Sequence, residues 1–368
     1  MTRPLTMLVL AVALVAGGCS GDDDDAASTT VAPSTTVSSS TTTTTDRAVS
    51  LEESLRLTDA CPGIGALTGE AELTWIADDR IWAASPDGGE PHCVAEFTGF
   101  PALRWGGDAD RLAAGERSVL LVSGPAPVVP EDHRVIGWSR PTGRALIARG
   151  PDGALTKLSP AGEPRFDLPL PLTTGDVQYH PAGTAIALVS IQPDSVTPPD
   201  LLFASNQGED VRWLVQNESA AAITDVEFSA DGALLFTADH GGHWHLHRLV
   251  LGTEDLEILL EGPAPLHGLT ASPWADGDFA VGRPGGCGDG EGLWVRRGEE
   301  VVDLAGTAIA SGTPVGWFPN GDLAVIVHPD GCDLPPGDLY VLTDGGPRLV
   351  AEDVGAAAVR APLPPPAV

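Results

Sequence analysis

A unit of two apolar strands joined by a glycine-containing turn recurs along most of this chain and limits the folds open to it. In nearly every unit the first strand carries an aromatic residue just before the turn, and the units begin about 40 residues apart. Such units bury their apolar faces only against their neighbours, so a single repetitive architecture is predicted. Six stretches show the pattern: ALRWGGDADRLAA (102–114), VIGWSRPTGRALIA (135–148), DVQYHPAGTAIALV (176–189), DVEFSADGALLFTA (225–238), LTASPWADGDFAV (269–281) and PVGWFPNGDLAVIV (314–327).

The turns give a physical reason for the hairpin within each unit. Glycine supplies the positive φ that a tight turn needs, and an Asp or Asn before it tolerates a left-handed backbone. With 44 Gly and 33 Pro among 368 residues, the composition also favours short strands over long helices. An all-β chain of four-stranded propeller blades is therefore predicted. The four clearest turns are Pro181-Ala182-Gly183, Ala230-Asp231-Gly232, Ala275-Asp276-Gly277 and Pro319-Asn320-Gly321.

A later strand of each unit repeats as well, with an apolar or aromatic centre. The combination of the Asp/Asn-Gly hairpin with this strand resembles the repeats of TolB-like and WD-repeat-like bacterial propellers over about residues 72 to 361. No unit has the Gly-His and Trp-Asp dipeptides of true WD repeats. The resemblance implies a propeller fold and carries no implication for chemistry. The later strands are DLLFAS (200–205), HWHLHRL (243–249), GLWVRRG (292–298) and DLYVLTD (338–344).

The two ends of the repeat region predict how the ring closes. Residues 72–97 hold only three strands, whereas the C-terminus supplies a spare strand at 356–362. Adding that strand to the first blade gives a seven-bladed propeller over 72–362 and removes most free sheet edges. The second unit, 102–129, is short, so a six-bladed ring is the alternative. A Pro-rich tail at 363–368 follows the ring.

The N-terminus has the features of a secretion signal. Arg3 supplies a positive start, and the apolar stretch Leu5–Ala16 is too short to span a bilayer. The sequence Ala16-Gly17-Gly18-Cys19 resembles the bacterial lipobox, whose cysteine becomes lipid-modified and N-terminal after cleavage. Residues 1–18 are therefore predicted to be a lipoprotein signal peptide, with Cys19 as the lipidation site. Because Ala16 stands where the lipobox usually has Leu, an ordinary signal peptide is the alternative.

A polar segment separates this signal from the repeats. Residues 19–49 contain the acidic run Asp22–Asp25 and a tract rich in Ser and Thr, which together cannot bury an apolar face. We expect this segment to be a disordered tether. It would hold the globular head away from the membrane, lipid-anchored on the extracytoplasmic side.

Residues 50–71 form a lead-in before the ring. Ser50-Leu51-Glu52-Glu53 matches the capping-box pattern, which predicts a short helix over about 51–57. Once Cys19 is set aside, four cysteines remain, and an even number in an exported chain predicts two disulfides. The pairing predicted from position joins the lead-in to the first blade through Cys61–Cys93 and joins neighbouring loops through Cys287–Cys332.

Four of the nine histidines lie between residues 240 and 247. His243, His245 and His247 alternate along one expected strand and would share one face, which makes them candidate ligands for a transition metal. The alternative is structural. Aligning the later strands places His245 with Trp294, at a position that packs between blades, and neighbours on one face lie about 7 Å apart, which is wide for a shared ion.

The loops between second and third strands are long in the last four units and would emerge on one face of the ring. They predict a binding face, with ordinary variation in loop length as the alternative. The acidic residues of the same loops also suggest another function, a sensor that binds a cation or a solute. The candidate residues are Asp194, Asp200, Asp239, His240, His243, Asp289, Asp330 and Asp333.

The net charge of −31 excludes sequence-independent nucleic-acid binding, because so acidic a surface repels phosphate backbones. Neither a Gly-x-Ser-x-Gly elbow nor a phosphate-binding loop is present, and no cofactor is predicted. These observations favour a membrane-anchored, non-enzymatic module that binds a protein or polymer of the cell envelope. An extracytoplasmic enzyme of lyase or glycosidase type and a metal or solute sensor are the alternatives.

Overall fold

In the computed structural model, the residues that can be described lie within Ser50–Val368. The predicted signal peptide, Cys19 and the predicted tether lie outside the described residues. Within the described ranges no helix has the length and apolar character needed to span a bilayer. The described residues are 53–67, 71–125, 129–130, 132–139, 145–159, 163–170, 174–190, 200–215, 222–253, 255–263, 265–283, 292–304, 307–328 and 336–363.

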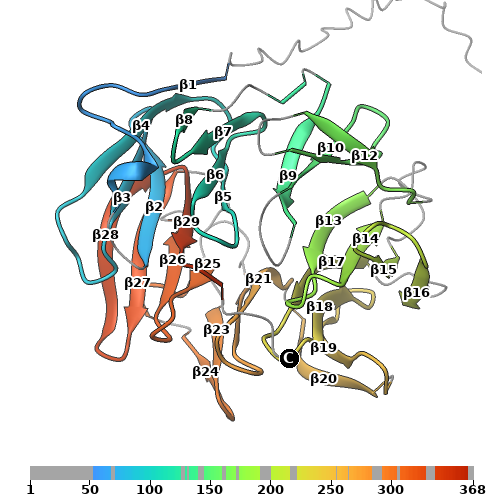
Figure 1. The fold of residues 1–368 in the computed structure, drawn as a ribbon. Helices are drawn as coiled ribbons and strands as arrows, with labels where there is room; N and C mark the ends of the chain where they lie inside the picture. Colours follow the sequence, from blue (N-terminus) through green and yellow to red (C-terminus); the bar gives the residue numbers. More distant parts are fainter. Residues whose placement is uncertain are drawn as a thin grey trace, which may run out of the picture. The chain divides into compact units, whose positions relative to one another are not determined.

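Seven antiparallel sheets are arranged in a ring, which confirms the seven-bladed propeller and excludes the six-bladed alternative (Figure 1). We number the blades 1 to 7 in chain order. Blade 1 has five strands and takes one of them from the C-terminus. Its strands are β1 (Ser54–Arg56), β2 (Glu72–Ala77), β3 (Arg80–Ala84), β4 (His92–Thr98) and β29 (Ala356–Arg360).

Blades 2 to 4 are four-stranded sheets of consecutive strands. Blade 2 contains β5 (Leu103–Trp105), β6 (Arg111–Ala114), β7 (Ser118–Leu121) and β8 (Gly124–Pro125). Blade 3 contains β9 (Arg134–Trp138), β10 (Leu146–Arg149), β11 (Leu155–Leu158) and β12 (Pro164–Asp167). Blade 4 contains β13 (Thr174–Tyr179), β14 (Ala185–Ser190), β15 (Leu201–Ser205) and β16 (Arg212–Val215).

Blades 5 to 7 have the same consecutive order. Blade 5 contains β17 (Ala222–Phe228), β18 (Leu234–Asp239), β19 (Trp244–Val250) and β20 (Asp255–Gly262). Blade 6 contains β21 (His267–Ala271), β22 (Phe279–Arg283), β23 (Gly292–Arg297) and β24 (Glu300–Asp303). Blade 7 contains β25 (Gly312–Trp317), β26 (Leu323–Val327), β27 (Gly337–Thr343) and β28 (Gly346–Val354).

The C-terminal strand closes the ring as the sequence predicts. β29 pairs antiparallel with β2, in a register that runs from Glu72 opposite Arg360 to Ile76 opposite Ala356. Thr74 lies in the middle of β2, and its buried hydroxyl donates to the Ala358 carbonyl at 2.9 Å. Because β29 is the innermost strand of blade 1, the two ends of the repeat region complete one sheet.

The lead-in differs from its prediction, because no helix forms over the described part of 51–57. Ser54–Arg56 is instead strand β1, which pairs with β4 at the outer edge of blade 1. The capping-box residue Glu53 serves another segment: its carboxylate accepts hydrogen bonds from the backbone N–H groups of Glu116 and Arg117 in blade 2, at 2.8 and 2.9 Å. One turn of 3-10 helix follows at Ile64–Ala66.

A disulfide ties the lead-in to blade 1. Cys61 and Cys93 are bonded, with their Cα atoms 4.6 Å apart, which confirms the predicted pairing. Both residues are buried. The second predicted pair, Cys287 and Cys332, lies outside the described residues and stays a prediction.

The recurring aromatic residues pack where one blade meets the next. Trp138, Tyr179, Phe228 and Trp317 are buried. Three tryptophans also donate their indole N–H to a strand of the preceding blade, namely β2, β5 or β21. The repeated aromatic residue therefore contributes hydrogen bonds between blades as well as buried apolar area. The pairs are Trp105 Nε1 to Thr74 Oγ1 at 2.9 Å, Trp138 Nε1 to the Arg104 carbonyl at 3.0 Å and Trp317 Nε1 to the Thr270 carbonyl at 3.4 Å.

The core consists of layers shared between neighbouring blades. Leu201 of blade 4 belongs to the same buried cluster as Phe236 of blade 5. On the other face of the blade 5 sheet, Leu235 joins a cluster with Phe279 of blade 6. The blade 5 sheet is therefore covered on both faces, which explains why its second strand, β18, is buried at nearly every position.

Candidate functional site

The hairpin between β18 and β19 places the histidines of blade 5. The loop 240–243 closes with a hydrogen bond from the His240 N–H to the His243 carbonyl at 2.8 Å. Gly241 and Gly242 have φ values of 74° and 93°, which a side chain would disfavour. The Asp239 carboxylate accepts from the Gly242 N–H at 2.6 Å. These contacts return the chain tightly, so that His240 faces the beginning of β19.

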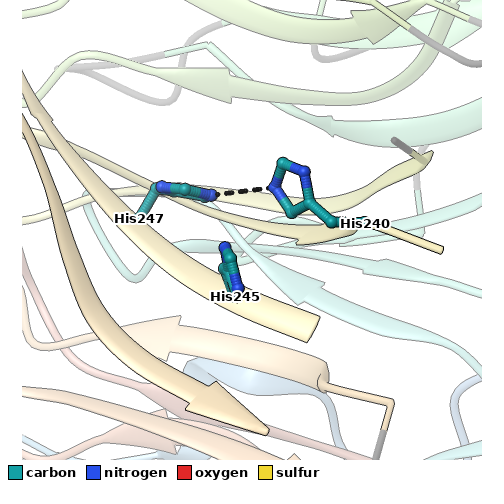
Figure 2. Close-up of side chains that lie close together, drawn as sticks. All are labelled: His240, His245 and His247. Carbon is teal, nitrogen blue, oxygen red and sulfur yellow. Dashed lines mark hydrogen bonds between the residues drawn. The ribbon is translucent and has the colours of Figure 1, made fainter. Parts of the chain in front are cut away.

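Three imidazoles converge at this end of the hairpin (Figure 2). His240 comes from the loop, whereas His245 and His247 come from β19. The Nε2 atoms of His240 and His247 lie 3.3 Å apart, so that one ring donates a hydrogen bond to the other. The ring centroids of His240 and His245 are 4.6 Å apart, and those of His245 and His247 are 5.5 Å apart. We call these three residues the histidine cluster.

The histidine cluster runs from solvent into the core. His240 is exposed, His245 is half-buried, and His247 is 6% exposed and stacks on Phe236 with ring centroids 4.9 Å apart. Burial, together with the neighbouring His240 and His245, lowers the pKa of His247 to about 4. Burial and His245 also lower the pKa of His240, against an opposing effect of Asp239. His247 is therefore a neutral imidazole at neutral pH.

The structure corrects the predicted membership of this group. His243 was expected to share a face with His245 and His247, but β19 begins at Trp244, and His243 lies exposed in the loop. Alternation along a strand therefore does not apply to it. His240, predicted only as part of a binding face, takes its place. Two consecutive glycines were the signal in the sequence for a loop that folds His240 back.

The strand alignment made from sequence was also shifted by two residues. His247 pairs with Phe236 in the register that places Trp294 opposite Val281 and Tyr340 opposite Val325. Thus His247, and not His245, takes the position between blades that is aromatic in blades 6 and 7. Its Nδ1 is buried and has no hydrogen-bond partner within the part of the chain that the structure describes.

A cavity of about 350 Å³ lies where the innermost strands of the blades meet. Backbone, glycine and apolar side chains make up most of its wall. Its one carboxylate among the described residues is Glu227, which accepts a hydrogen bond from Gln178 Nε2 at 3.0 Å. Tyr179 also lines it, and the buried Tyr179 hydroxyl has no partner among the residues described. Burial raises the pKa of Tyr179, so its hydroxyl keeps its proton and remains a donor.

The predicted binding face is described only in part. Asp194, Asp289, Asp330 and Asp333 lie outside the described residues, and their role in binding stays a prediction. Asp200 is described and is buried; its backbone N–H donates to Ser190 Oγ at 3.1 Å. The remaining members, Asp239, His240 and His243, lie together in the blade 5 hairpin described above.

Comparison with known proteins identifies the fold. Oligogalacturonate lyase in complex with manganese matches with a TM-score of 0.54 and 12% identity, over 71% of this chain and 82% of that one. TolB from Acinetobacter baumannii matches with a TM-score of 0.47 and 17% identity, over 82% and 69%. Virginiamycin B lyase from Staphylococcus aureus matches with a TM-score of 0.47 and 10% identity, over 84% and 99%.

No protein-family model and no curated protein sequence matches the chain. At these identities the structural likeness concerns the fold alone, since propellers with unrelated sequences carry unrelated functions. Function has to be argued from the residues of this chain.

Proposed function

We propose that this chain is an exported, lipid-anchored β-propeller that acts as a non-enzymatic binding module for a protein or polymer of the cell envelope. The observation that carries the proposal is the cavity at the centre of the ring. Its volume falls in the range of sites that hold small ligands or a projecting group of a larger one. The closed ring keeps its wall rigid, which lowers the entropy cost of binding.

The chemistry of the wall indicates what the cavity would accept. Gln178 and Glu227 present an amide and a carboxylate as a hydrogen-bonded pair on the wall of the cavity. Groups of this kind bind hydroxyl and amide groups of a partner. A sugar or peptide segment of an envelope component has that chemistry.

Cross-linking in native membranes tests the binding module. A full-length variant with Gln178→Ala and Glu227→Ala should lose the cross-linked partner that the unmodified protein captures. The matched control is Glu257→Ala, which changes an exposed carboxylate in β20 on the outer rim of blade 5 and should retain the partner. Equal capture by all three proteins would contradict a role for the cavity. If the unmodified protein chemically converts the partner and the Glu227→Gln variant does not, the protein is an enzyme and not a binding module.

The predicted anchor has its own test. Cys19→Ser removes the thiol to which a lipid would be attached, so the variant should appear in the soluble fraction after cell disruption. Neighbouring Ser20→Ala keeps the thiol and should stay with the membranes. A Cys19→Ser protein that still sediments with membranes at high salt would contradict the proposed lipid attachment at Cys19.

A further inference from the structure

We propose that His240, His245 and His247 form an open binding site for a late first-row divalent metal ion, with Zn²⁺ as the expected occupant. Imidazole nitrogen is a preferred ligand of Zn²⁺, Ni²⁺ and Cu²⁺, and three such ligands with a free position make a recurring zinc site. The site is independent of the central cavity and of the binding function proposed above, because none of its residues lines that cavity.

The distance between two of the imidazoles fits a shared metal ion as well as it fits the hydrogen bond described above. Two nitrogens that each lie about 2.05 Å from one ion at the tetrahedral angle are about 3.3 Å apart. The Nε2 atoms of His240 and His247 are separated by that distance. One ligand nitrogen from each of the three residues lies within 4.8 Å of the others. Binding of an ion would draw the His245 ring toward the other two.

The separation along the strand does not oppose this geometry. Residues that alternate on one face of a strand lie about 7 Å apart at their backbones. The rings of His245 and His247 lean toward each other, so that their centroids are 5.5 Å apart. His240 approaches both from the loop, which makes it the residue that completes the site (Figure 2).

Two of the three ligands are held in place by contacts that do not involve the ion. His247 stacks on Phe236 with an angle of 20° between the rings. His240 is fixed by the loop, where its own N–H is bonded to the His243 carbonyl. Ligands that are already in position lose little conformational freedom on binding, which favours affinity.

A purely structural role explains this arrangement poorly. Blades 6 and 7 have Trp294 and Tyr340 at the position of His247, and either residue packs there with a large apolar surface. Blade 5 instead buries an imidazole whose Nδ1 has no partner among the described residues. A buried polar atom without a hydrogen bond is unfavourable, and a departure from the repeat at such a cost is expected where the side chain has a function.

The exposure of the three residues indicates that the site is open. His240 lies at the surface and His247 in the core, so an ion between them would be reached from the loop side. Imidazole ligands bring no negative charge to the ion. The free coordination position would therefore take water or an anionic group, such as a carboxylate or phosphate.

The test is a Zn²⁺ titration of the full-length chain, prepared without a polyhistidine tag and stripped with a chelator. We expect binding of one equivalent and a rise in melting temperature of roughly 5 °C when Zn²⁺ reaches about a thousand times its dissociation constant. His240→Ala should abolish both, because it removes the exposed ligand without disturbing the core. His243→Ala is the matched control, since that residue lies in the same loop, is exposed and is not part of the cluster.

Substitution of Co²⁺ for Zn²⁺ provides a second readout. Cobalt bound by three imidazoles in a four-coordinate site gives an intense visible absorption that the hydrated ion lacks. We expect this band in the unmodified protein and in His243→Ala, and its absence in His240→Ala and His245→Ala. Equal Zn²⁺ responses of His240→Ala and His243→Ala would overturn the proposal, as would no Zn²⁺ binding by the unmodified protein.

Discussion

Blade 1 and blade 5 use polar side chains in opposite ways. In blade 1, Thr74 Oγ1 donates to the Ala358 carbonyl and accepts from Trp105 Nε1, so one hydroxyl joins the two ends of the chain to blade 2. In blade 5, His247 is buried without a partner for its Nδ1 among the described residues. The contrast indicates that blade 1 is built for closure, whereas blade 5 gives up some stability to bring three imidazoles together.

Of the changes that test this comparison, removal of the closing strand β29 should lower the free energy of unfolding most. Truncation after Val354 deletes β29 and leaves the edge of β2 unpaired, so we expect a loss of about 5 kcal/mol or more, comparable to the whole stability of a domain. Urea unfolding and size-exclusion chromatography would show it as unfolding and aggregation. Truncation after Leu363 keeps β29 and should behave normally. A Val354 truncation that melts within about two degrees of the intact protein would show that closure does not depend on β29.

The disulfide of blade 1 should have the next largest effect. Replacing both Cys61 and Cys93 by Ser frees a loop with a sequence separation of 32 residues. We expect a loss of about 3 kcal/mol in the free energy of unfolding, measured from urea curves. The same paired change at Cys287 and Cys332 measures the second predicted disulfide by itself. A loss below about 1 kcal/mol at Cys61 and Cys93 would mean that β29 alone carries the closure.

Thr74→Val tests the hydrogen bonds at the junction of the two chain ends. Valine keeps the shape but leaves the Ala358 carbonyl and the Trp105 indole without their partner, which should cost about 1–2 kcal/mol. Thr253→Val, in the exposed turn of blade 5, is the control and should change stability by less than about 0.5 kcal/mol. If both substitutions had equal effects, the hydroxyl of Thr74 would have no special part in closure.

The smallest change in the free energy of unfolding is expected for a substitution in blade 5, and it should be an increase. In metal-free protein, His247→Phe keeps the stack on Phe236 and removes an unsatisfied buried nitrogen, so stability should rise by about 0.5–1 kcal/mol. Tyr340→Phe, at the equivalent position of blade 7, should be nearly neutral. Destabilisation of the metal-free protein by His247→Phe would mean that this imidazole is part of the structural core after all.

The repeat made much of the fold predictable. Glycines such as Gly232 and Gly321 have φ values of 80° and 86°, and each terminates a turn whose chemistry can be read from the sequence. Asp231 accepts from the Ala233 N–H, and Asn320 from the Asp322 N–H, as expected for residues that bond to their own turn. Local signals of this kind, found in six stretches, predict the hairpins of the blades, and the three-stranded unit at 72–97 with the spare strand at 356–362 predicts ring closure.

Features that depend on contacts between distant segments could not be predicted in this way. Glu53 matches a helix-capping pattern, but its carboxylate accepts hydrogen bonds from the N–H groups of Glu116 and Arg117 in blade 2 instead. The expected helix also fails to form because Ser54–Arg56 pairs with the edge of β4 as strand β1. In blade 5 the alternation of His243, His245 and His247 gave the wrong set, because the strand begins one residue later and the loop returns His240.

Hydrogen exchange of the full-length chain, with and without Zn²⁺, tests the contrast between the two blades most directly. If blade 5 holds a metal site and blade 1 is purely structural, Zn²⁺ should slow exchange in β18, β19 and the loop between them, where His240, His245 and His247 lie. Strands β2 and β29 of blade 1 should exchange at the same rate in both conditions. Unchanged exchange in blade 5, or equal slowing in both blades, would contradict this account.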